Sequence, residues 1–70
     1  MRLSELSIGK SVKIEALPKT DALSHRLFEM GFHEGMTVRA VLSYGELYEY
    51  KIGETLVALK PKECKNILIK

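Results

Sequence analysis

The residues best suited to chemistry lie in one stretch of the chain. His25 and Glu29 are four positions apart, a spacing that puts both on one face of a helix, and His33 and Glu34 follow shortly. Imidazole and carboxylate groups are ligands for transition metals, but a metal site also needs a defined and supported set of ligands. Two ligands on a helix with a third in a loop do not supply one. A solvated helix face is the favoured interpretation, so the sequence predicts no metal site and no cofactor.

Cys64 is the only cysteine, and it offers no further chemistry. It has no disulfide partner, no Cys/His metal framework can be assembled around it, and a lone cysteine usually behaves as a small apolar residue. The sequence offers no arrangement of Ser, His and Asp typical of a catalytic triad, and no pair of carboxylates that could act as general acid and base. The glycines are not spaced as a dinucleotide fingerprint or a phosphate-binding loop. The sequence therefore predicts a protein that is not an enzyme, has no catalytic residue and does not bind nucleotides.

The elements that carry these residues follow from hydrophobic periodicity. Residues 11–17 alternate between apolar and charged side chains, which predicts a half-buried strand. Thr20 or Asp21 is the expected cap of a short helix, and Gly31 is expected to end it in the left-handed conformation. One apolar stripe of that helix faces the core and is formed by Leu23, Leu27 and Met30.

The rest of the chain reads as strands joined by tight turns. Strands are predicted at 37–42, 48–52, 55–59 and 67–69, with turns at 43–45 and at Gly53-Glu54, and Pro61 is expected to break the fourth strand. Five short strands and one helix inserted after the first predict a mainly β fold, a small closed or nearly closed barrel. Residues 1–70 form a single domain. The expected core consists of Ile14, Leu23, Leu27, Met30, Val38, Val57 and Leu59.

Four glycines are expected to serve the backbone and to bind nothing. Gly31 and Gly35 bracket the connection from the helix to the next strand, and Gly9 and Gly53 fall at turns. Glycine takes positive φ at little cost, so another residue at Gly31 or Gly35 should destabilise the fold by about 1 kcal/mol or more.

Several segments together resemble a known family. The chain carries Leu3-x-x-Leu6-x-x-Gly9 and Ile14-x-x-Leu17, and then a block made of residues 26–32 followed by x-x-Gly35-x-x-Val38. Later come the segments 53–60 and 67–69. This pattern resembles the FeoA family of ferrous iron transport accessory proteins. The resemblance covers essentially the whole chain, and its most specific part is the block from Arg26 to Val38.

The resemblance implies a fold and a partner. It implies a five-stranded SH3-like barrel with one short helix after the first strand. It also implies a cytoplasmic accessory role beside FeoB, the membrane transporter of ferrous iron, whose cytoplasmic GTP-binding domain would be the partner. The single unpaired thiol agrees with the reducing cytoplasm, and no apolar run approaches the roughly 20 residues of a membrane span.

The partner-binding candidates are Arg26, Phe28, Glu29 and Tyr48. Phe28 lies well away from the centre of the apolar helix stripe, so it is either covered by a loop or exposed as an anchor for a partner. Because the family that the chain resembles is apolar at this position, burial under a loop of the barrel is expected. Self-association would be favoured by an exposed strand edge or an apolar rim.

Two alternative functions remain open. One is a regulatory SH3-like domain related to metal-dependent repressors, which is disfavoured because a helix-turn-helix does not fit within 70 residues. The other is a small nucleic-acid-binding barrel. Lys60, Lys62, Lys65 and Lys70 gather near the C-terminus, but the formal net charge is only +2. Binding to nucleic acid is therefore not expected.

Overall fold

The computed structural model describes residues 1–18 and 21–70, apart from the side chain of residue 21. The helix cap expected at Thr20 or Asp21 lies outside this part. Along the chain the elements are the 3-10 helix η1 (Leu3–Glu5), β1 (Ser11–Ala16), α1 (Asp21–Glu29), β2 (Thr37–Tyr44), β3 (Leu47–Ile52), β4 (Thr55–Leu59), the short helix α2 (Pro61–Cys64) and β5 (Leu68–Ile69). No helix in the described part is long and apolar enough to span a membrane.

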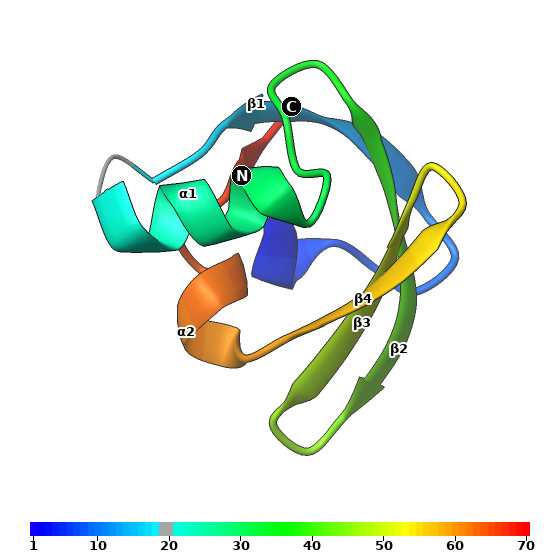
Figure 1. Cartoon of the computed structure of the whole chain (residues 1–70). Coiled ribbons are helices and arrows are strands. Elements are labelled where there is room, and N and C mark those ends of the chain that lie inside the picture. Colours follow the sequence, from blue (N-terminus) through cyan, green and yellow to red (C-terminus); the bar gives the residue numbers. More distant parts are fainter. Residues whose placement is uncertain (19–20) are drawn as a thin grey trace.

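The five strands form one antiparallel sheet in the order β4-β3-β2-β1-β5. The mainly β architecture with a helix after the first strand is therefore confirmed. In the described part, β4 and β5 are the edges of the sheet and do not pair with each other, so the curled sheet is open between them. Helix α2 connects these two edges, and α1 lies beside α2 on the same side of the molecule (Figure 1).

Two tight turns set the register of the β2–β3–β4 meander. The pairs Tyr44↔Leu47 and Ile52↔Thr55 close two-residue turns that begin with Gly45 and Gly53. Each of these glycines has φ near +60°, whereas no residue other than glycine has positive φ in the described part. This combination is typical of a type II′ turn, in which only the first central residue needs positive φ. The first turn thus lies at Gly45-Glu46, slightly later than the predicted turn at 43–45, because Gly45 is the residue that can open it.

The core consists of side chains from every strand and from η1, α1 and α2. Of the seven predicted core residues five are buried, while Leu23 and Met30 are partly buried and pack against the core. The full set of buried apolar residues is Leu3, Ile14, Leu27, Phe32, Val38, Ala40, Tyr50, Ile52, Val57, Leu59, Cys64, Ile67 and Ile69.

The helices η1 and α2 were not predicted. In each, a glutamate at the third helical position accepts a hydrogen bond from the backbone N–H just before the helix: Arg2 to Glu5 Oε1 at 2.7 Å, and Lys60 to Glu63 Oε1 at 3.0 Å. This contact satisfies one of the free N–H groups at a helix start. Pro61 ends β4 as expected, and it also forms the first residue of α2, where its missing N–H costs nothing.

Candidate docking surface

Helix α1 presents a buried and an exposed face. Leu27 is fully buried, and Leu23 and Met30 extend its contact with the core. The rest of its surface carries His25, Arg26, Phe28 and Glu29, which are exposed. Three of the four predicted partner-binding residues therefore lie on one helix, whereas Tyr48 belongs to β3.

The C-terminal end of α1 is fixed by a Schellman motif. Gly31 has φ +100°, its N–H donates to the carbonyl of Phe28 at 3.0 Å, and the N–H of Phe32 donates to the carbonyl of Leu27 at 3.0 Å. The two residues joined by the second bond, Phe32 and Leu27, are both fully buried. This pattern of two bonds and an apolar contact ends a helix rigidly. It holds Phe28, within the last turn of α1, in a defined position.

Phe28 is exposed, with 58% of its surface accessible, and the prediction that a loop covers it was wrong. The physical reason lies in the turn at Gly31. The chain reverses there and directs Phe32, not Phe28, into the core. Phe28 instead packs against the ring of His33, with ring centroids 4.2 Å apart and planes tilted by 55°. An aromatic pair is thus displayed on the surface beside the end of α1.

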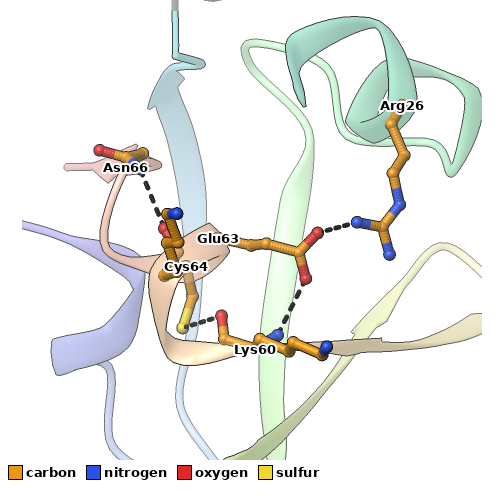
Figure 2. A network of polar contacts seen from close by, with 6 residues as sticks. Arg26, Lys60, Glu63, Cys64 and Asn66 are labelled. Atoms are coloured by element: carbon orange, nitrogen blue, oxygen red, sulfur yellow. Dashed lines mark hydrogen bonds and ion pairs between the residues drawn. The ribbon is translucent and has the colours of Figure 1, made fainter. Parts of the chain in front are cut away.

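Arg26 joins α1 to α2. Its guanidinium forms an ion pair with the carboxylate of Glu63, which also accepts the hydrogen bond from the backbone N–H of Lys60 (Figure 2). Glu63 is only 7% exposed, so both donors compensate a carboxylate that has largely left water. Arg26 itself remains more than half exposed. It therefore holds two elements together while keeping part of its surface accessible.

Glu29 pairs with a neighbour on its own helix. Its Oε1 lies 3.4 Å from His25 Nε2, and both side chains are largely exposed. The ring of His33 packs against Phe28. In the described part no three His, Cys, Asp or Glu side chains gather into a group that could hold a metal ion.

Tyr48 lies at the margin of the core. It is partly buried, and its ring stacks on that of Tyr50 with centroids 6.4 Å apart. Tyr50 is fully buried and donates a hydrogen bond from its hydroxyl to the carbonyl of Leu3 at 3.3 Å. Burial raises the pKa of the Tyr50 hydroxyl strongly, and it also raises the pKa of the Cys64 thiol. Tyr44, by contrast, is 79% exposed at the β2–β3 turn.

The four glycines predicted to lie in turns all have positive φ: Gly9 at 90°, Gly31 at 100°, Gly35 at 86° and Gly53 at 60°. A Cβ atom at any of them would meet no atom closer than 3.7 Å, the distance from Gly31 to Ile52 Cγ2. Backbone conformation rather than lack of space is therefore what favours glycine at these positions.

One surface feature was not predicted from the sequence. Arg2 joins Lys60, Lys62 and Lys65 around a shallow pocket of about 530 Å³, which Glu46 also lines. Arg2 reaches this place because its backbone bridges Leu68 at the other end of the chain. No local signal could have shown this, because the two ends of the chain meet only in the folded sheet.

A family model for the FeoA domain matches residues 1–70. The chain belongs to the FeoA family. A comparison with curated protein sequences gives no match.

Solved structures of FeoA proteins share this fold. FeoA of Stenotrophomonas maltophilia is 34% identical, with a TM-score of 0.90 over 100% of this chain and 89% of that one. That protein was crystallised with zinc and is described as an SH3 domain protein and a candidate ferrous iron transport activating factor. The SH3-like fold of this FeoA chain is thereby confirmed.

Two solution structures agree with this result. Iron(II) transport protein A of Clostridium thermocellum is 29% identical, with a TM-score of 0.94 over 100% of this chain and 44% of that one. The FeoA protein of Chlorobium tepidum is 22% identical, with a TM-score of 0.91 over 99% of this chain and 68% of that one, and shows the shared fold.

Proposed function

We propose that this FeoA protein is a non-enzymatic, cytoplasmic accessory protein of ferrous iron transport. It docks on the cytoplasmic GTP-binding part of a FeoB-type membrane transporter and supports or regulates transport. Family membership over residues 1–70 supports the assignment to iron transport. So does the likeness to the protein described as a candidate transport activating factor.

The exposed pair of Phe28 and His33 is the observation that supports docking through α1. Phe28 is more than half exposed, yet its backbone is held by the Schellman motif and by the ion pair that ties α1 to α2. A rigid aromatic side chain at the surface is a typical anchor of protein interfaces, since little conformational entropy is lost when a partner covers it. Arg26 and Glu29 flank this anchor with exposed charges of opposite sign.

Docking changes the activity of a transporter only under one thermodynamic condition. The chain must bind one conformational state of the transporter more tightly than the other, and the difference in affinity limits the shift in population. A small rigid barrel meets this condition when its contact surface fits only one of the two arrangements of the transporter.

The partner can be identified by affinity capture from membranes of the native cell, with the tagged chain as bait and mass spectrometry as readout. Recovery of a ferrous iron transporter is expected. Recovery of ribosomes or DNA alone would overturn the proposal.

The role of Phe28 is tested by calorimetric titration of the transporter's purified cytoplasmic part with two variants. Phe28→Ala is expected to weaken binding by about tenfold or more, because aromatic anchors dominate interface energies. Tyr44→Ala is the matched control, since it removes an even more exposed aromatic ring from a different element. Equal effects of the two variants would show that α1 is not the docking surface.

A further inference from the structure

Strand β4 is an edge strand with one free side. Among the described residues it pairs with β3 alone, through an unbroken register from Ile52↔Thr55 to Tyr48↔Leu59. The residues that close a two-residue hairpin turn exchange hydrogen bonds, and such pairs alternate along the ladder. The backbone groups of Thr55, Val57 and Leu59 therefore point toward β3. Those of Leu56 and Ala58 point to the opposite side.

No other described element pairs with this free side. Outside the β3–β4 ladder, no backbone hydrogen bond among the described residues involves Leu56 or Ala58. A groove of about 480 Å³ runs along the strand instead, lined on one side by residues 55–58 and on the other by the end of α1 at Glu29, Met30 and Gly31.

The free side also lacks the features that normally protect an edge strand. Charged residues, proline or a bulge usually prevent pairing with another chain, but Thr-Leu-Val-Ala-Leu contains no charge and no proline, and its ladder with β3 has no register shift. The side chain of Leu56 is 62% exposed on the outer face. The other edge of the sheet, β5, is only two residues long.

The segment around β4 is complementary to itself in antiparallel orientation. When two copies pair about a two-fold axis at Val57, Leu56 of each copy lies opposite Ala58 of the other. In the same register Glu54, in the turn just before β4, comes near Lys60, just after β4, of the other copy, so two pairs of opposite charge flank the strands. Lys60 continues the extended backbone of β4, with φ −86° and ψ 157°.

This register is favoured over its neighbours. Leu56 and Ala58 carry the free backbone groups, so the two-fold axis can lie at Leu56, Val57 or Ala58 without loss of hydrogen bonding. An axis at Leu56 would place Glu54 opposite Ala58, and an axis at Ala58 would place Lys60 opposite Leu56. Only the axis at Val57 pairs both charges.

We propose that this protein forms a two-fold symmetric homodimer in which β4 pairs antiparallel with β4 of a second copy about Val57. The reciprocal pairs of Leu56 with Ala58 then exchange backbone hydrogen bonds between the copies, and the two sheets become one continuous sheet. The proposal goes beyond docking on a transporter and does not depend on it.

Sedimentation velocity of the purified chain, at protein concentrations up to about 1 mM, tests the dimer, because interfaces of a single strand pair are small and weak. A rising sedimentation coefficient with concentration is expected for the wild type, and association should weaken with added salt. Glu54→Lys and Lys60→Glu each place like charges opposite each other twice, and each is expected to raise the dissociation constant by about tenfold or more. A wild type that stays monomeric throughout overturns the proposal.

Recombining the two charge reversals tests the register. The double variant E54K/K60E, and likewise an equimolar mixture of the two single variants, restores opposite charges at both positions and should recover the dimer. Glu46→Lys is the matched control, because Glu46 occupies the same position in the β2–β3 turn and should leave association unchanged. Failure of both combinations to recover association, with circular dichroism showing folded protein, would exclude this register.

Amide hydrogen exchange gives a second readout that does not rely on a variant. The amides of Leu56 and Ala58 should become protected as the concentration of wild-type protein rises, whereas protection of the Val57 amide, which points toward β3, should not depend on concentration. Exchange at Leu56 and Ala58 that is independent of concentration, in a sample that does associate, would show that the dimer uses another surface.

Discussion

Glu63 shows how one carboxylate fixes the junction of two helices. It is nearly buried, and it accepts the backbone N–H of Lys60 and the guanidinium of Arg26. Glu5 makes the same backbone contact at the start of η1, but at an exposed position. The two sites therefore separate the effect of capping from the effect of burial.

Glu63→Ala is expected to lower the free energy of unfolding by about 2 kcal/mol, because a backbone donor loses its partner and a packed side chain is removed. Arg26→Ala should cost less, about 1 kcal/mol, because the guanidinium is more than half exposed and water screens the pair. Urea denaturation measures both changes, and Glu5→Ala, expected to cost less than 1 kcal/mol, is the control. If Glu63→Ala costs no more than Glu5→Ala, the buried ion pair contributes nothing to the fold.

The buried hydroxyl of Tyr50 makes stability depend on alkaline pH. Burial raises the pKa of Tyr50 above the value of 10.0 that it has when unfolded. Above pH 10 the unfolded chain therefore loses this proton while the folded chain keeps it, which favours unfolding. The stabilising effect is complete below pH 10, and above it stability should fall by at most about 1.4 kcal/mol per pH unit from this one group.

Tyr50→Phe removes this group and should make stability less dependent on pH above 10 than in the wild type. At neutral pH the variant should lose about 1 kcal/mol with the hydrogen bond to the Leu3 carbonyl. Urea denaturation at pH 8 and pH 10.5 gives both numbers. Tyr44→Phe, which removes an exposed hydroxyl, is the control, and an equal response of the two variants would contradict the role given to burial.

At the scale of elements, two adjacent residues of α1 have different expected roles, one in the core and one in recognition of a partner. Leu27 is fully buried and Phe28 is mostly exposed. Leu27→Ala is expected to cost about 2–5 kcal/mol, a large part of the stability of so small a domain. Phe28→Ala should change stability by less than about 1 kcal/mol, because most of this side chain is already exposed and its contact with the His33 ring is at the surface. Thermal unfolding of the two variants measures the contrast, and comparable losses would mean that Phe28 is part of the core.

The strands and their turns could be predicted from sequence because their signals are local. Alternating side chains mark β1 and β3, and a glycine marks each hairpin turn, although only the turn at Gly53-Glu54 was predicted at its observed position. The helices η1 and α2 could not be predicted in this way, since they are too short to show a period. Their local signal is a glutamate at the third helical position, which caps the N–H of the residue just before the helix. This pattern is weak because that preceding residue, the N-cap, is not a serine or threonine.

The candidate docking surface was predictable only in part. Helical periodicity placed Phe28 away from the buried stripe, but it could not decide whether a loop covers this side chain. That depended on which of two phenylalanines enters the core after the turn at Gly31, and Phe32 does. The ion pair of Arg26 with Glu63 could not be predicted either, because Glu63 lies far along the chain and contacts Arg26 only when α1 and α2 pack together.

At the scale of the whole molecule, the distribution of charge argues against nucleic acid as the partner. The net charge is +2, and four cations gather around one shallow pocket, at Arg2, Lys60, Lys62 and Lys65. Sequence-tolerant binding of single strands requires a longer basic groove with aromatic side chains on which bases stack. Glu46 lines the same pocket and reduces its positive potential.

Fluorescence anisotropy with labelled single-stranded RNA and DNA measures the consequence. No binding tighter than about 100 µM is expected near physiological salt, because an affinity carried by four cations alone falls steeply as the salt concentration rises and the release of counterions gains less entropy. At low salt any residual binding should follow a slope of about −3 in the logarithm of salt concentration for single strands, and Lys62→Ala with Lys65→Ala should reduce that slope. Submicromolar binding near physiological salt would instead favour the nucleic-acid-binding barrel, because phosphate contacts from this one pocket cannot supply such affinity without stacking of the bases.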